Sequence, residues 1–168
     1  MVATRVEQRV QGKPATIAGF PVRVVLVKDF EGDALVEQTL DYYTQCDDGS
    51  VWYVGEKVND IEDGKVVGHG GQWQAGKNGA KPGLFMPAEP KAGETFQQER
   101  APGVAEDEST VEAIDVGVTT AAGKFKGCVK TKDYAPIDKT TEFKFYCPNV
   151  GLVREELEEG SSELVRYG

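Results

Sequence analysis

Residues 41–56 read DYYTQCDDGSVWYVGE, two runs rich in aromatic and β-branched residues on either side of Asp47-Asp48-Gly49-Ser50. Such runs favour β-strands, and a short connection that contains Asp-Gly favours a hairpin between them. The stretch therefore predicts two antiparallel strands joined by a tight turn, and it indicates an all-β protein.

The same alternation of apolar and polar residues, interrupted by Gly, Pro, Asn and Asp, recurs along the chain and predicts roughly ten to twelve strands. The best helical candidate, Val153–Leu164, is broken by Gly160-Ser161-Ser162, so we expect two short strands there, or a strand and a frayed end. The predicted strands are Thr4–Val10, Pro21–Phe30, Ala34–Cys46, Val51–Val58, Lys65–Trp73, Thr95–Arg100, Ser109–Val116, Lys124–Tyr134, Thr141–Cys147, Gly151–Leu157 and Ser162–Tyr167.

The connections between these strands are short, for example Glu31–Asp33, Glu62–Gly64 and Pro148–Gly151. Short connections join antiparallel neighbours, because a parallel crossover needs roughly a dozen residues or more. At 168 residues the chain is within the usual size of one domain. The sequence therefore predicts a single β-domain over residues 1–168, an antiparallel meander that forms a barrel, a strongly curved half-barrel or a sandwich.

The charge of the chain argues against some partners. With 28 acidic and 19 basic residues the formal net charge is -9, which disfavours binding to nucleic acid or to an anionic membrane surface. No apolar run approaches the roughly 20 residues that cross a bilayer, and residues 1–7 lack the apolar core of a signal peptide. The chain reads as soluble, and the residues alone leave open whether it is cytoplasmic or an exported protein without its signal.

The three cysteines, Cys46, Cys128 and Cys147, are widely spaced and lack the Cys-x-x-Cys pattern of zinc and redox sites. Free cysteines are often buried as small apolar residues, which is the first interpretation here, and one disulfide is the alternative. Cys147 alternates with Phe143 and Phe145, whereas Cys128 alternates with lysines, and this pattern predicts opposite faces. We therefore do not expect a bridge between Cys128 and Cys147.

Residues 74–94 break the strand pattern, because they are rich in Gly and Pro around the apolar triplet Leu84-Phe85-Met86. This composition predicts a long loop. The triplet either plugs an open end of the barrel, since apolar residues usually complete a core, or forms a lid over a binding cavity.

Few residues suggest metal or phosphate chemistry. His69, the only histidine, lies in Gly68–Gly71, and a metal site or a catalytic triad needs partners that the sequence does not signal. Phosphate loops lead into a helix, whereas this glycine-rich segment leads into a β-rich one, which favours a bulge or a close approach of two backbones. Asp47–Ser50 lacks the distal glutamate of a calcium loop. We expect no metal site and no cofactor.

Paired carboxyl groups are the serious candidates for catalysis, since burial can separate their pKa values and allow general acid-base chemistry. Asp41 and Glu56 lie about equally far from the hairpin turn and could face the same side, and Glu99 comes from the later half of the chain. These three are weak candidate catalytic residues, because most acids in so acidic a chain must be solvated.

Aromatic residues are numerous, and most of them would fill the interior of a barrel or leave a cavity for a small apolar ligand. The candidate ligand-binding residues are Tyr43, Trp52 and Trp73 as the lining and Leu84, Phe85 and Met86 as the gate.

Several blocks of the sequence resemble a family of uncharacterised bacterial secreted or lipid-anchored β-domains, over roughly Val22 to Glu155. The resemblance implies a location outside the cytoplasm, with membrane association only through an anchor that this sequence lacks, and it implies no activity. Gln74 stands where members of the family tend to have Glu. The blocks are DYY at 41–43, GSVWYVGE at 49–56, GQWQAG at 71–76, AKPGLFMP at 80–87, GVAED at 103–107 and FYCPNVGLV at 145–153.

The sequence supports more than one function. The first is a non-enzymatic binding or structural module that holds a small apolar molecule or a protein segment. The second is a small β-barrel enzyme, such as a cyclase or isomerase, that uses Asp41 or Glu56 with Glu99 for proton transfer on a hydrophobic substrate. An exposed sheet edge that pairs with another protein or a second copy is a third.

Overall fold

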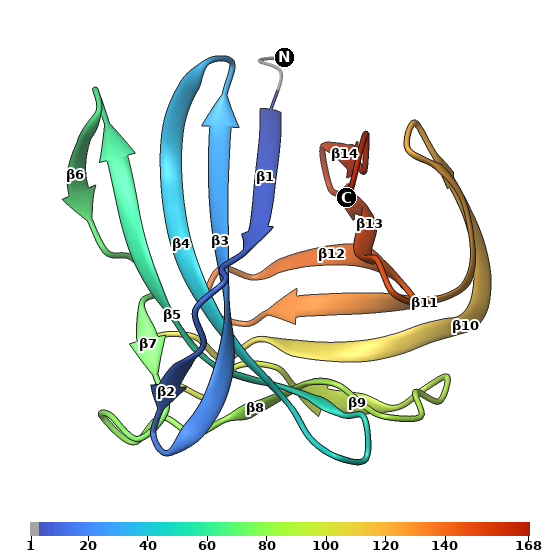
Figure 1. Cartoon of the computed structure of the whole chain (residues 1–168), viewed down its shortest axis with the longest axis horizontal. Helices are drawn as coiled ribbons and strands as arrows, with labels where there is room; N and C mark the ends of the chain where they lie inside the picture. Colours follow the sequence, from blue (N-terminus) through green and yellow to red (C-terminus); the bar gives the residue numbers. More distant parts are fainter. Residues whose placement is uncertain (1–3) are drawn as a thin grey trace. The chain divides into compact units, whose positions relative to one another are not determined.

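The computed structural model describes residues 4–168, and these form strands and turns without a helix. The strands make two antiparallel sheets, one of eight strands and one of six (Figure 1). Strands that follow one another in the sequence are mostly neighbours in a sheet. The predictions of an all-β protein and of an antiparallel meander are confirmed.

The first sheet contains β1 (Thr4–Val10), β2 (Ala15–Ile17), β3 (Phe20–Glu31), β4 (Ala34–Gln45), β5 (Val51–Glu62), β6 (Lys65–Gly68), β7 (Trp73–Gln74) and β8 (Gly83–Met86). The second contains β9 (Thr95–Gln97), β10 (Glu108–Thr120), β11 (Gly123–Ala135), β12 (Thr140–Cys147), β13 (Gly151–Leu157) and β14 (Gly160–Glu163). The hairpin of β13 and β14 confirms that the acidic segment Val153–Leu164 is not a helix.

The chain divides into two compact units, each with its own sheet. The first unit comprises the chain up to Met86 together with Gln98–Glu106, and the second comprises Pro87–Gln97 and Asp107–Gly168. Within the described residues no ladder closes either sheet on itself. The barrel and the single domain therefore stay predictions. No helix of residues 4–168 is long and apolar enough to span a membrane.

Strands β4 and β5 form the hairpin predicted for residues 41–56. Their ladder runs from Gln45 opposite Val51 to Glu37 opposite Asp60. A bulge between Tyr42 and Tyr43 shifts the register by one residue. Asp48 stabilises the turn, because its Oδ1 accepts bonds from the Ser50 amide at 2.8 Å and from the Ser50 hydroxyl at 2.7 Å. The hairpin prediction is confirmed, and its register determines which side chains of the two strands meet.

Strand β5 has further partners that the sequence did not indicate. Beyond β4 it pairs with β6, with β7 and with β8 at successive places along its length. The predicted strand Lys65–Trp73 is wrong in its second half, where residues 69–72 turn between β6 and β7. The predicted loop over residues 74–94 is wrong at Gly83–Met86, because this segment forms β8. The apolar triplet is thus part of a sheet.

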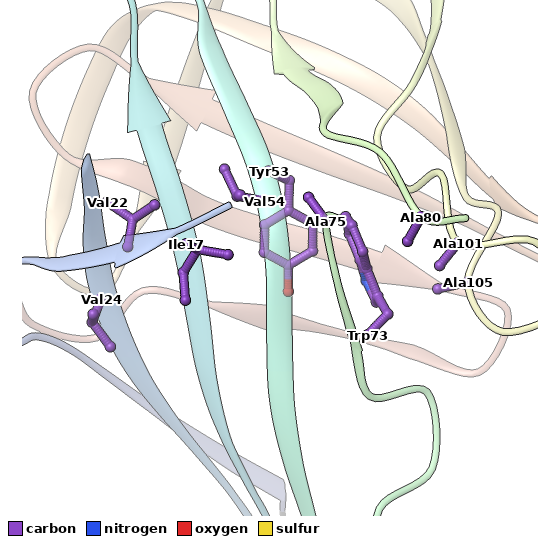
Figure 2. Close-up of a cluster of buried hydrophobic side chains, with 10 residues drawn as sticks. All are labelled: Ile17, Val22, Val24, Tyr53, Val54, Trp73, Ala75, Ala80, Ala101 and Ala105. Carbon is purple, nitrogen blue, oxygen red and sulfur yellow. The ribbon is translucent and has the colours of Figure 1, made fainter. Parts of the chain in front are cut away.

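The core of the first unit gathers side chains from β2, β3, β5 and β7 and from the turns that follow them (Figure 2). Tyr53 packs against the edge of the Trp73 ring, with 5.4 Å between ring centroids. Burial of such aromatic and aliphatic surface contributes roughly 25 cal/mol per Å². The buried members are Ile17, Val22, Val24, Tyr53, Val54, Trp73, Ala75, Ala80, Ala101 and Ala105.

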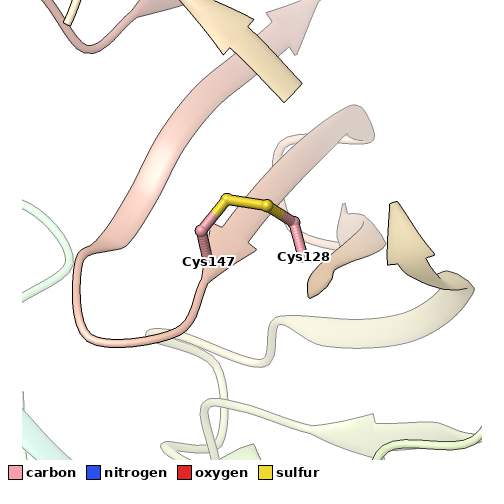
Figure 3. The surroundings of a disulfide bond; sticks show 2 residues. All are labelled: Cys128 and Cys147. Carbon is pink, nitrogen blue, oxygen red and sulfur yellow. A yellow bond between two sulfur atoms is a disulfide. The ribbon is translucent and has the colours of Figure 1, made fainter. Parts of the chain in front are cut away.

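The second unit contains a disulfide between Cys128 on β11 and Cys147 on β12 (Figure 3). The expectation that these two cysteines lie on opposite faces is wrong. Lys130 is the register partner of Phe145, and its Nζ lies 4.4 Å from the centroid of the Phe143 ring. Lysines and phenylalanines can share a face of a sheet, because the aliphatic stem and the ammonium group of a lysine can cover an aromatic ring. The cysteines continue this ladder and face each other, and they pack with Val118 and Val153, whereas Cys46 is free and exposed.

Candidate functional site

A pocket of about 270 Å³ lies in the first unit beside β5 and β7. Strand β5 contributes Glu56 and Lys57, and β7 contributes Trp73 and Gln74. The rest of the lining comes from Tyr42 on β4, from Gln72 just before β7, and from turns within residues 77–80 and 101–104. This volume is just below the usual range of ligand pockets, roughly 300–1,000 Å³, so the site has room only for a small molecule.

Gly55 lets the wall of this pocket form. Its backbone has a φ of 136°, and a Cβ atom placed there would lie 2.5 Å from the carbonyl oxygen of Trp73. Because Gly55 has no side chain, β7 can pair with β5, with Trp73 opposite Glu56 and Gln74 opposite Gly55. The Ala75 amide continues this contact and donates to the Val54 carbonyl at 2.9 Å. The close approach of two backbones therefore places the Trp73 ring at the pocket.

The weak candidate catalytic residues come together beside this wall. Asp41 and Glu56 are direct partners across β4 and β5, so their side chains lie on one face of the sheet. The Tyr53 hydroxyl donates to Asp41 Oδ1 at 3.3 Å. The Trp73 indole Nε1 donates to Glu99 Oε1 at 3.4 Å. Of the three acids, Glu56 lines the pocket itself.

The surroundings of Glu56 hold its carboxyl group in the protonated form around neutral pH. Burial raises the pKa of Glu56 to about 8, and the negative charges of Glu99 and Asp41 add to the effect. A hydrogen bond with Tyr53 acts in the opposite direction and is weaker. Burial also raises the pKa of Asp41. The site thus contains a carboxyl group that can donate a hydrogen bond or a proton at neutral pH.

These raised pKa values predict that the protein is more stable at mildly acidic than at mildly alkaline pH. The folded state binds the Glu56 proton more tightly than the unfolded state does, so the free energy of unfolding falls as pH rises. The Glu56 contribution is fully present below the ordinary glutamate pKa of 4.5 and is lost as pH rises through the folded-state pKa of about 8. We expect denaturant unfolding to show a loss on the order of 2 kcal/mol between about pH 5.5 and about pH 8.5.

The matched variants are Glu56→Gln and Glu62→Gln, the second at an exposed position of the same strand. Glu56→Gln should reduce the loss and raise stability at about pH 8.5, because the neutral amide does not ionise. Glu62→Gln should leave the pH dependence as in the wild type. A wild-type profile that is flat across this range would show that Glu56 ionises freely in the folded protein.

The candidate ligand-binding residues separate into groups. Trp73 lines the pocket. Tyr43 stacks on Tyr53 with 4.8 Å between ring centroids, and Phe85 meets Tyr43 edge-on at 4.9 Å, so both complete the aromatic side of the core. The Trp52 indole donates to Ser50 Oγ at 3.1 Å, beside the hairpin turn. Leu84 and Met86 lie on β8, opposite Trp52 and Val51.

Much of the pocket lining was not foreseen. Lys77 and Asn78 belong to the glycine-rich turn after β7, and Pro102 and Val104 belong to a turn closed by the Ala101 amide, which donates to the Ala105 carbonyl at 2.9 Å. The composition of residues 74–94 predicted a loop at the first place. It did not indicate that two turns far apart in the sequence line one pocket.

The glycine-rich segment Gly68–Gly71 is anchored by side chains. The Gly70 amide donates to Asp60 Oδ2 at 2.9 Å, and His69 Nδ1 lies 2.6 Å from the Val58 carbonyl oxygen and donates to it. The Val58 amide in turn donates to Gln72 Oε1 at 3.3 Å. His69 therefore holds a turn in place. Among residues 4–168 no group of three or more His, Cys, Asp and Glu side chains is arranged to hold a metal ion.

A second group of ionisable side chains lies in the second unit. Lys144 Nζ lies 3.6, 3.1 and 3.5 Å from carboxylate oxygens of Asp133, Glu142 and Glu155. The Ser109 hydroxyl donates to Asp133 Oδ1 at 2.6 Å. The lysine charge is matched by acids on β11, β12 and β13, so this network joins neighbouring strands.

Comparisons of the chain with protein families, with curated proteins and with solved structures found no match. The resemblance to secreted or lipid-anchored β-domains therefore stays a prediction, and the geometry of the site carries the functional argument.

Proposed function

We propose that the protein is a non-enzymatic binding module that holds a small, partly apolar molecule in the pocket beside β5 and β7. The observation that carries this proposal is the pocket of about 270 Å³ whose lining combines the Trp73 ring with the Glu56 carboxyl group. Apolar side chains of the lining can hold a small molecule by contact, while its polar side chains can fix the orientation of that molecule. The aromatic residues Tyr43, Tyr53 and Phe85 support the wall from the core side.

The pair of variants Val104→Glu and Val66→Glu tests this proposal. Both valines are exposed, at 45% and 54%, but Val104 lines the pocket and Val66 lies on β6 away from it. In a fragment screen by NMR, Val104→Glu should weaken the binding of the fragments that bind the wild type by about tenfold, because a charged side chain fills the pocket rim. Val66→Glu should bind them like the wild type. Equal affinities for all three proteins, or no bound fragment, would refute the pocket as a binding site.

An enzyme that transfers a proton to or from a hydrophobic substrate is the second candidate. The raised pKa of Glu56, about 8, favours it, because a general acid works best when its pKa is near the operating pH. In this case Glu56 would be the general acid, and the negative charges of Asp41 and Glu99 would keep it protonated. Turnover that Glu56→Gln abolishes while leaving binding intact would decide for the enzyme.

We propose an extracytoplasmic location, which the Cys128–Cys147 disulfide supports, because disulfides persist in oxidising compartments. Strand β1 is an edge of the first sheet and is exposed along its whole length, so it supports the proposal of an edge contact with another chain.

A further inference from the structure

We propose that Glu56 determines the specificity of the pocket and selects a neutral ligand with a carbonyl or amide oxygen, to which the Glu56 carboxyl donates its hydrogen. This inference rests on the proposed binding function and adds the chemical class of the ligand.

The position of Glu56 on the sheet favours the protonated carboxyl. Side chains of direct partners on antiparallel strands have Cβ atoms about 5 Å apart, so Asp41 and Glu56 meet on one face. None of the ion pairs found among residues 4–168 involves either of them. Two acidic side chains that meet in this way disfavour each other's ionisation, so one of them stays protonated, and Glu56 is the one that lines the pocket. The rise in the pKa of Glu56 agrees with this geometry.

The other charges around the pocket argue for a neutral ligand. The remaining charged residues of the lining are Lys57 and Lys77, which disfavour an organic cation. Asp41 and Glu99 act on Glu56 from the core side and disfavour an anion there. The titratable groups that act on Glu56 or line its pocket are Glu37, Asp41 and Tyr42 on β4, Tyr53 and Lys57 on β5, and Lys77 and Glu99 on the connecting segments.

The uncharged part of the lining suits an amide. Gln74 and Asn78 present carboxamide groups to the pocket, and an amide can both donate to and accept from such groups. Trp73 offers the flat apolar surface on which an aromatic ring of the ligand can rest. An aryl amide therefore fits this lining: its amide group can bond with Glu56, Gln74 and Asn78, and its aromatic ring can rest on Trp73.

The test uses four fragments of similar size: N-methylbenzamide, acetophenone, benzylamine and benzoate. Their dissociation constants are measured by NMR titration of the full chain at about pH 6.5 and about pH 9. We expect the two neutral fragments to bind the wild type in preference to the two charged ones. With a pKa of about 8, Glu56 is mostly ionised at the higher pH, and their affinity should fall about tenfold there.

Two variants separate the hydrogen-bond donor from the shape of the side chain. Glu56→Gln keeps a donor that does not ionise, so the neutral fragments should bind it equally at both pH values. Glu56→Leu has no donor, and the neutral fragments should bind it at least tenfold more weakly than they bind the wild type at about pH 6.5. A circular dichroism spectrum of each variant checks that the sheets are intact.

The inference is overturned if benzylamine or benzoate binds more tightly than the neutral fragments, if wild-type affinity does not change with pH, or if none of the four binds at about 5 mM. The broader proposal has a separate readout. Some fragments, of any class, could bind more weakly to Val104→Glu but not to Val66→Glu. The pocket would then still be a binding site, even where the role of Glu56 is rejected.

Discussion

Gly55→Ala is expected to destabilise the first unit by about 3–5 kcal/mol and to remove ligand binding, the largest effect of a single substitution that the structure predicts. An alanine Cβ at this position would lie 2.5 Å from the Trp73 carbonyl oxygen and 2.8 Å from Gln74 Cα. Both of these are backbone atoms, so no side chain can rotate away. The φ of 136° adds strain, because residues with a Cβ rarely adopt it. The new methyl group must therefore separate β7 from β5.

Gly123→Ala is the matched control, because Gly123 has a similar φ of 144° but no atom within 4 Å of an added Cβ. It should show the backbone strain alone, about 1–2 kcal/mol. Tryptophan fluorescence during denaturant unfolding measures Gly55→Ala, since Trp52 and Trp73 both lie in the first unit, and hydrogen exchange of the β10 and β11 amides measures Gly123→Ala in the second unit. Equal losses of stability in the two variants would show that the approach of β7 to Gly55 contributes little.

The contacts around Gly55 include some that could be predicted from the sequence and some that could not. The repeat of aromatic and β-branched residues predicted β4 and β5, and the equal distance of Asp41 and Glu56 from the turn predicted that they could meet. They are partners in the ladder, because the bulge beside Tyr42 and Tyr43 leaves Val54 of β5 without a partner on β4 and so shifts Asp41 opposite Glu56. Side-chain alternation over a short hairpin is a local property, which is why it could be read from the residues.

The features that the sequence did not disclose depend on pairing between distant segments. The two residues of β7 and the four of β8 are too short to show a period, although both pair with β5 and the pairing of β7 with β5 forms the pocket wall. The disulfide was missed because lysines on β11 were assigned to the solvent side, whereas Lys130 covers Phe143. The identity of a ladder partner is a long-range property, and alternation within one strand does not reveal it.

The double variant Cys128→Ala/Cys147→Ala is expected to lose about 3 kcal/mol of stability in the second unit. The bond closes a loop between residues 19 apart in the sequence, and closing a loop of this size removes about that much free energy from the unfolded chain. The two sulfur atoms also belong to the buried cluster with Val118 and Val153, so their removal adds a small loss of packing. Hydrogen exchange of the β11, β12 and β13 amides measures this loss of stability in the strands around the disulfide.

Cys46→Ala is the control for this prediction, because Cys46 is exposed and forms no disulfide in the described structure, and its stability should match the wild type. Reduction of the wild type under native conditions should reproduce the loss seen in the double variant, since both remove the same cross-link. Tryptophan fluorescence should change far less than exchange on β11 to β13, because both tryptophans lie in the first unit and the disulfide lies in the second. A double variant as stable as the wild type would mean that the paired strands constrain this loop without the covalent bond, and that the disulfide serves chemistry or export instead of stability.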